Sequence, residues 1–127
     1  MTNSNTPITK APACNDSMKN APTVMTFFER FEADILSGKK TITIRDESER
    51  DYVPGSRVDV STFEDGRGFC QLDIISVEPI LFDDLSLFHA EQENMTLAQL
   101  KAVIQEIYPG IEQLYVVSYK LAQRISL

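Results

Sequence analysis

The spacing of apolar residues predicts a short helix that begins near residue 27 and is followed at once by a strand. In FFERFEADILSG the apolar side chains recur at helical spacing, and a glycine follows the last of them as a helix C-cap does. The next segment, TITIR, alternates and is rich in β-branched residues, which is typical of a strand. The apolar helix positions are Phe27, Phe28, Phe31, Ile35 and Leu36.

Two further alternating segments predict a hairpin in the middle of the chain. RVDVSTF, at residues 57–63, alternates, and GFCQLDIISVEPI, at residues 68–80, is a longer strand that we expect to bend near Ser76. The EDGRG segment between them is a hairpin loop. Ahead of them, Pro54 and Gly55 form the corner of a tight turn.

The last third of the chain predicts helices followed by a strand. FDDLSLFHAEQEN indicates a helix capped by Asp83 or Asp84 and anchored by Leu85 and Phe88. TLAQ, beginning at Thr96, is a capping box that opens an amphipathic helix, and a Pro-Gly pair ends it. LYVVSYKLA then forms the last strand. This order of elements predicts an α+β domain whose short strands curl into a partly closed barrel.

Composition limits the domain to part of the chain. Residues 1–24 hold three of the six prolines and no aromatic residue, so we expect a disordered tail over 1–24 and a single domain over 25–127. The tail has neither the apolar core of a signal peptide nor the arginines of a transit peptide, and no apolar run is long enough for a membrane span. We therefore expect a cytoplasmic protein without membrane contact, and a monomer because no large apolar seam is evident.

Charge narrows the classes of partner. Twelve basic residues stand against nineteen acidic ones, a net charge of −7, which argues against long RNA or DNA and tolerates a small uncharged ligand. Two cysteines and the single histidine, His89, cannot make a familiar zinc site. We expect no metal and no cofactor, and any Cys-His or Ser-His-Asp mechanism would have to use His89.

The GKKTITIRDES segment contains a candidate nucleophile and base. A threonine hydroxyl such as that of Thr43 needs a base, and Lys40 can serve only if it is neutral. Burial, or a second cation such as Lys39 or Arg45, would lower the pKa of Lys40. In a regular strand Lys40 faces away from Thr43, so it can reach Thr43 only if residues 38–40 still belong to the turn that leaves the helix. The alternative is a solvated lysine beside ordinary strand-forming threonines.

The HAEQEN segment offers a candidate acid. Glu91 or Glu93 could protonate a leaving group if an apolar surrounding raised its pKa. The alternative is a solvated connection between two helices, and the residues alone do not choose between the two glutamates. The charged RDESER segment is interpreted as a salt-bridged surface loop.

Three strings together resemble one family. TFFERFEADILSGKKTITIRDESE, HAEQENMTLAQLKAVIQEIYPG and LYVVSYK are similar to the small bacterial ASCH-domain proteins of the N4-acetylcytidine amidohydrolase family. The resemblance covers about residues 26–121. It implies a small PUA-like β-barrel with packed helices. It also implies metal-independent hydrolysis of the amide that joins an acetyl group to the exocyclic nitrogen of cytidine.

The resemblance also implies roles for individual residues. The catalytic lysine of the family falls on Lys40, its nucleophilic threonine on Thr43 and its acidic residue on Glu93. Arg45 lies on the same strand face as Thr43, and we take it as a candidate for stabilising the oxyanion or orienting a nucleoside substrate. Two rival functions stay open: a non-catalytic PUA-like module that binds RNA, and a regulator that binds a nucleoside without converting it.

Overall fold

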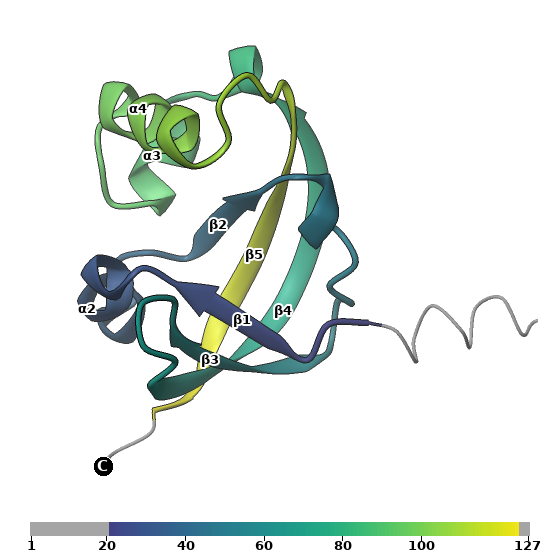
Figure 1. The fold of residues 1–127 in the computed structure, drawn as a ribbon, viewed down its shortest axis with the longest axis vertical. Helices are drawn as coiled ribbons and strands as arrows, with labels where there is room; N and C mark the ends of the chain where they lie inside the picture. The colour runs from purple at the N-terminus through teal and green to yellow at the C-terminus, as the bar shows by residue number, and fades with distance from the viewer. Residues whose placement is uncertain (1–20, 125–127) are drawn as a thin grey trace, which may run out of the picture.

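The computed structural model describes residues 21–124, which form one five-stranded sheet with helices gathered on its open side (Figure 1). The strand order is β1-β3-β4-β5-β2, with β1 parallel to β3 and the other neighbours antiparallel. The α+β architecture predicted from the sequence is confirmed. The strands are β1 (Val24–Phe27), β2 (Ile42–Arg45), β3 (Arg57–Thr62), β4 (Gly68–Leu81) and β5 (Gln113–Arg124).

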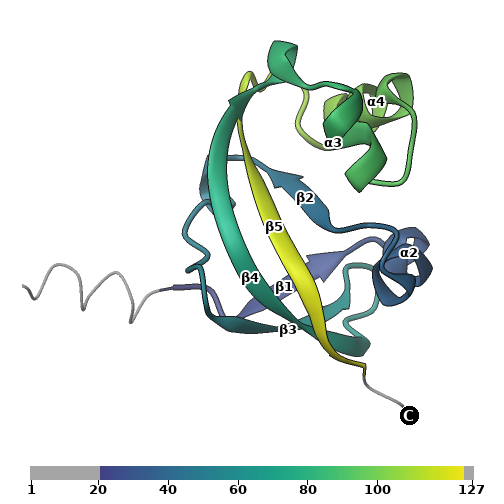
Figure 2. The same cartoon turned by 180° about the vertical axis from the view of Figure 1, so that it is seen from behind.

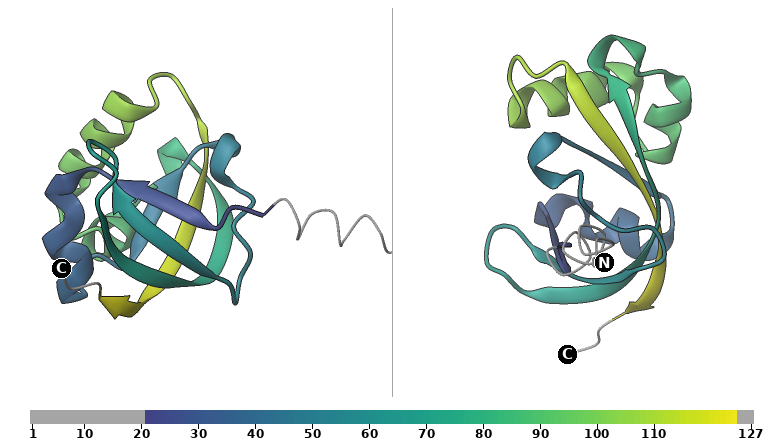
Figure 3. Two further views of the ribbon diagram at one scale, coloured as in Figure 1. Left: turned by 60° about the horizontal axis from the view of Figure 1, so that its bottom comes forward. Right: turned by 90° about the vertical axis from the view of Figure 1, so that its right-hand side faces the viewer.

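The sheet curls until its two edge strands approach each other. The long strands β4 and β5 cross the whole molecule, as the view from behind shows (Figure 2). Their register shifts between Ile74 and Ser76, where the sequence predicted a bend. Figure 3 shows the resulting curvature from two further sides. At the opening of the curl, Arg45 in β2 donates a hydrogen bond to the backbone oxygen of Thr26 in β1.

Strand β1 corrects the predicted start of the first helix. Phe27 belongs to β1, and Phe28 precedes a 3-10 turn, η1 (Glu29–Phe31), that leads into α2 (Glu32–Ser37). The four residues of β1 alternate between exposed and buried, and they pair with β3 far along the chain. Long-range pairing therefore overrides the helical spacing at Phe27. The predicted tail lies mostly outside the described residues, and Val24, at its end, opens β1.

The helices near the C-terminal strand also differ in detail from the prediction. The 3-10 turn η3 (Phe82–Asp84) precedes α3 (Leu87–Gln92), whose N-cap is Ser86 and not Asp83 or Asp84. The 3-10 turn ends at Leu85, a buried residue with an extended backbone, so the chain cannot run on from Asp83 or Asp84 into a helix. Ser86, the residue after Leu85, therefore caps α3. Phe88 is 63% exposed and is not an anchor.

Helix α4 (Leu97–Ile107) confirms the predicted capping box. The Thr96 hydroxyl oxygen accepts a hydrogen bond from the Gln99 backbone nitrogen at 3.1 Å, and Gln99 Oε1 accepts one from the Thr96 backbone nitrogen at 2.9 Å. No helix within residues 21–124 is long and apolar enough to cross a membrane.

The apolar interior consists of two clusters of buried side chains, and a cavity lies between them. One cluster lies between the curled sheet and α2, and the other lies between β2, β5 and the pair α3 and α4. Phe27 and Ile35 belong to the first, and Ile44 and Leu100 to the second. A cavity lined by residues of both clusters lies where they meet.

Candidate active site

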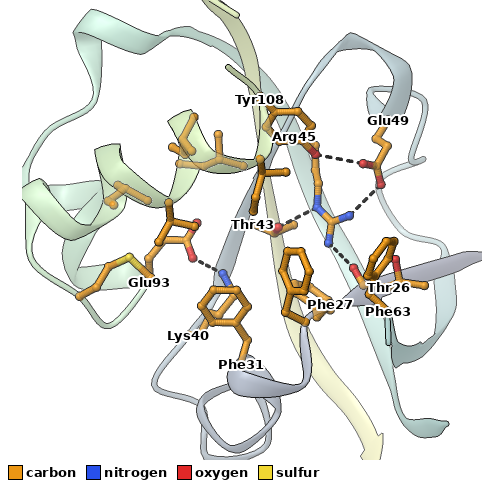
Figure 4. Close-up of a pocket in the computed structure, with 17 residues that line it drawn as sticks. Thr26, Phe27, Phe31, Lys40, Thr43, Arg45, Glu49, Phe63, Glu93 and Tyr108 are labelled. Carbon is orange, nitrogen blue, oxygen red and sulfur yellow. Dashed lines mark hydrogen bonds and ion pairs between the residues drawn. The ribbon is translucent and has the colours of Figure 1, made fainter. Parts of the chain in front are cut away.

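A cavity of about 270 Å³ lies between β1, β2, the loop after α3 and the inner face of α4 (Figure 4). Its wall is mostly aromatic and aliphatic. Four of the polar side chains that line it are less than 10% exposed. They are Lys40, Thr43, Arg45 and Glu93, the same four residues that the sequence analysis singled out.

Lys40 enters the cavity because the chain has not yet become a strand. Gly38 ends α2 in the left-handed region, with φ 81°, and the backbone nitrogens of Lys39 and Lys40 both donate to the Asp34 oxygen at 3.0 Å. Strand β2 begins only at Ile42. The condition set by the sequence, that residues 38–40 remain in the turn, is met.

The Lys40 ammonium group lies in a buried and partly aromatic surrounding. Its Nζ donates to the Ile42 backbone oxygen at 2.8 Å and to a carboxylate oxygen of Glu93. The ring centroids of Phe31 and Phe27 lie 5.1 and 5.6 Å from Nζ. Burial lowers the pKa of Lys40 from its ordinary value, against the opposing effect of the Glu93 carboxylate.

A second cation contributes to the same shift. The positive charge of Arg45 lowers the pKa of Lys40 further, after burial as the largest cause. Lys39, the other cation considered from the sequence, is exposed. Lys40 is therefore easier to neutralise than a lysine at the surface, as a general base must be.

The structure distinguishes the two candidate glutamates. Helix α3 ends at Gln92, so Glu93 occupies the C-cap and is 4% exposed, while Glu91 faces solvent. Asn94 follows with φ 59°, a left-handed conformation that turns the chain away. The backbone nitrogen of Thr41 donates to the Gln92 oxygen at 2.8 Å, which fixes this turn against the start of β2. Glu93 is thereby placed opposite Lys40.

Thr43 is paired with Arg45. Arg45 Nε donates to Thr43 Oγ1 at 2.8 Å, while its two terminal nitrogens donate to Glu49 at 2.7 Å and to the Thr26 backbone oxygen at 2.8 Å. The guanidinium carbon also lies 4.8 Å from the Phe27 ring centroid. Arg45 is thus held from three directions with one N–H aimed at the hydroxyl of Thr43.

Two residues of this network were not singled out from the sequence. Tyr108, at the C-terminal end of α4, donates its hydroxyl to Glu49 Oε2 at 3.1 Å, and Glu49 in turn holds Arg45. The i,i+4 spacing of Arg45 and Glu49 was the available signal, but it was interpreted as part of a surface loop. For Tyr108 the sequence offered no signal of this contact beyond its position on the apolar face of the predicted helix.

The four polar residues form two pairs. Lys40 is bonded to Glu93 and Thr43 to Arg45, and no hydrogen bond joins Lys40 Nζ to Thr43 Oγ1. His89 takes no part, since its Nδ1 lies 3.2 Å from the backbone nitrogen and from the hydroxyl of Ser86 at the α3 cap. Within residues 21–124, no three histidine, cysteine, aspartate or glutamate side chains gather as metal ligands would.

Curated relatives match most of the chain, although no family model does. The chain is 77% identical over 100 residues to the N(4)-acetylcytidine amidohydrolase of Vibrio vulnificus strain YJ016, covering 79% of this chain and 96% of the relative. It is 79% identical over 101 residues to the protein of the same name from Vibrio atlanticus strain LGP32, covering 80% and 97%.

Solved structures support the fold. The ASCH domain from Lactobacillus crispatus JV V101 superposes with a TM-score of 0.63 at 18% identity, and the match covers 85% of each chain. The curled sheet with helices on its open side is therefore the ASCH fold, as the resemblance implied.

Proposed function

This chain belongs to the N(4)-acetylcytidine amidohydrolase family, and we propose that its cavity hydrolyses N4-acetylcytidine to cytidine and acetate. The observation that carries the proposal is the pairing of a buried threonine hydroxyl with Arg45 beside a buried Lys40–Glu93 pair. A nucleophile, a base, an acid and a positioning group all reach one mainly apolar cavity.

The Lys40–Glu93 pair can supply both base and acid from one internal proton transfer. With the proton on Lys40 the pair is ammonium and carboxylate, and with the proton on Glu93 it is amine and carboxylic acid. Burial disfavours the charged form, so the neutral form lies closer in free energy than it would in water. In that form Lys40 can accept a proton and Glu93 can donate one.

In the proposed first half-reaction, Thr43 Oγ1 attacks the acetyl carbonyl carbon while its proton passes to the Lys40 amine. The tetrahedral intermediate collapses by breaking the bond to N4, and Glu93 gives its proton to that nitrogen as cytidine leaves. The products are an acetyl ester on Thr43, an ammonium on Lys40 and a carboxylate on Glu93. Arg45, bonded to Thr43 Oγ1 through Nε, orients the nucleophile for attack.

In the second half-reaction, water attacks the acetyl ester and gives a proton to the Glu93 carboxylate. The Thr43 oxygen leaves with the proton of the Lys40 ammonium, so acetic acid is released and both groups regain their starting forms. The proposed route uses side chains of this protein and one water molecule, and requires no metal or cofactor. The substrate is a small nucleoside, in keeping with the acidic net charge of −7.

The proposal is tested by following N4-acetylcytidine, cytidine and acetate with purified wild type and with Lys40→Ala, Thr43→Ala and Glu93→Ala. Glu91→Ala is the matched control, because it removes an exposed carboxylate two residues from Glu93. We expect turnover by wild type and Glu91→Ala and its loss in the other three. A folded wild type that binds the nucleoside without releasing acetate would overturn the proposal in favour of a non-catalytic binding module.

A further inference from the structure

The hairpin loop between β3 and β4, residues 63–67, presents an aromatic ring that the chemistry above does not use. Phe63 is 64% exposed and yet lines the same cavity as the four buried polar residues. Figure 4 places it beside Thr26, near the Arg45 side of the cavity. A phenylalanine left this exposed gains little from burial, so its packing in the fold does not account for its position.

Backbone hydrogen bonds fix the loop that carries this ring. The Phe63 nitrogen donates to the Phe27 oxygen at 2.7 Å, which ties the loop to β1. Across the loop, the Thr62 nitrogen donates to the Arg67 oxygen at 3.0 Å, and the Gly66 nitrogen donates to the Thr62 oxygen at 2.9 Å. Gly66 has φ 71°, which a glycine adopts without strain.

Side chains fasten the same loop to the neighbouring helix. Arg67 donates to both carboxylate oxygens of Glu32 in α2, at 2.5 and 3.2 Å. The ring of Phe63 packs against Phe28 with centroids 5.2 Å apart and planes at 63°, an edge-to-face arrangement. The loop therefore holds the exposed ring in a defined position before any ligand arrives.

The depth of the reacting groups defines where the rest of the substrate must lie. Lys40, Thr43 and Glu93 are 3–5% exposed, so an acetyl group has to reach the buried part of the cavity to be attacked. The amine that leaves then extends toward the exposed part, where Phe63 lies. If that amine belongs to a flat heteroaromatic ring, the ring meets an aromatic side chain.

We propose that Phe63 is a specificity-determining residue that stacks on the pyrimidine ring of the substrate. This inference rests on the proposed function and deepens it. Every nucleobase has a flat π-face that can stack on an aromatic side chain. Phe63 therefore selects amides whose nitrogen is attached to a planar aromatic ring over amides of aliphatic amines.

The test compares Phe63→Leu and Phe63→Trp by steady-state kinetics on N4-acetylcytidine, with inhibition by the product cytidine as a second measure of binding. Leucine keeps apolar bulk without a π-face, and tryptophan keeps the π-face. We expect Phe63→Leu to raise KM and the inhibition constant of cytidine by roughly 5- to 150-fold, with a much smaller change in kcat. Phe63→Trp should restore values near those of wild type.

Phe88→Leu is the matched control, since Phe88 is 63% exposed on α3 and does not line the cavity. It should leave KM unchanged. Unchanged KM in Phe63→Leu with normal wild-type turnover would overturn the inference and leave the proposed function intact. An equal loss on a small aliphatic acetamide, or no recovery in Phe63→Trp, would also overturn stacking. Absence of wild-type turnover would instead remove the proposed function itself.

Discussion

Removal of one member of the Lys40–Glu93 pair should destabilise the fold far more than removal of both. The two side chains are 3% and 6% exposed, so Lys40→Met leaves a buried carboxylate without its cation, and Glu93→Leu leaves a buried ammonium without its anion. Breaking a buried pair in this way costs about 3–5 kcal/mol. That is a large share of a total stability of about 5–15 kcal/mol for a domain of this size.

The double variant, Lys40→Met with Glu93→Leu, replaces the pair by apolar side chains in a mainly apolar surrounding. Such replacements are often neutral or stabilising, so most of the loss should be recovered. About 1 kcal/mol should remain lost, because the Ile42 backbone oxygen no longer accepts from Lys40 at 2.8 Å. The stable double variant should nevertheless be inactive, since both the base and the acid are gone.

Urea unfolding of the four proteins gives the coupling energy from a double-mutant cycle. The exposed pair Arg57–Asp73, at 2.8 Å, serves as the control, and its removal should cost no more than about 1 kcal/mol. Single variants that each lose less than about 1 kcal/mol would show that Lys40 and Glu93 are not a buried charge pair. A double variant no more stable than either single variant would show the same.

A contact behind Arg45, a buried tyrosine and the turn after α2 can each be tested by one substitution. Tyr108→Phe removes the hydroxyl that holds Glu49 at 3.1 Å, so kcat should fall severalfold while KM for N4-acetylcytidine changes little, and full retention of kcat would show that the contact is not used for positioning. Burial raises the pKa of Tyr119 above its ordinary value of about 10, so the folded chain keeps a proton that the unfolded chain loses. Stability should therefore fall as pH rises above about 10. Tyr119→Phe should flatten that loss in urea titrations, and an unchanged slope would contradict the assignment. Gly38→Ala forces a side chain into φ 81° and should cost about 1–2 kcal/mol in the same titration while lowering activity through Lys40; an unchanged midpoint would contradict the role of the turn.

The four residues singled out from the sequence line one cavity, and part of the reason is local. The glycine that ends α2 has a direct consequence for Lys40, because the left-handed C-cap at Gly38 leaves residues 39–41 outside the strand, which begins at Ile42. Lys40 and Thr43 could therefore be related by short-range geometry. The choice of Glu93 over Glu91 came from the family resemblance, and the burial of Glu93 at the end of α3 agrees with it.

What the sequence could not predict depends on contacts between distant segments. Strand β1 is only four residues long, and its pairing with β3 is what removes Phe27 from the helical pattern. Tyr108 and Glu49 are 59 positions apart in the sequence, so no local pattern predicts their hydrogen bond. The exposure of Phe63 at the cavity is likewise a result of how the β3–β4 loop folds back onto β1.

The most direct test of the proposed mechanism is a search for acetyl-threonine at residue 43. Wild type is mixed with N4-acetylcytidine, quenched in acid during turnover, digested and analysed by mass spectrometry, with Thr43→Ala treated in the same way. We expect an acetyl group on the peptide that contains Thr43 of wild type, and neither the acetyl group nor turnover in Thr43→Ala. Full turnover by folded Thr43→Ala would mean that water attacks the substrate directly and that Thr43 is not the nucleophile.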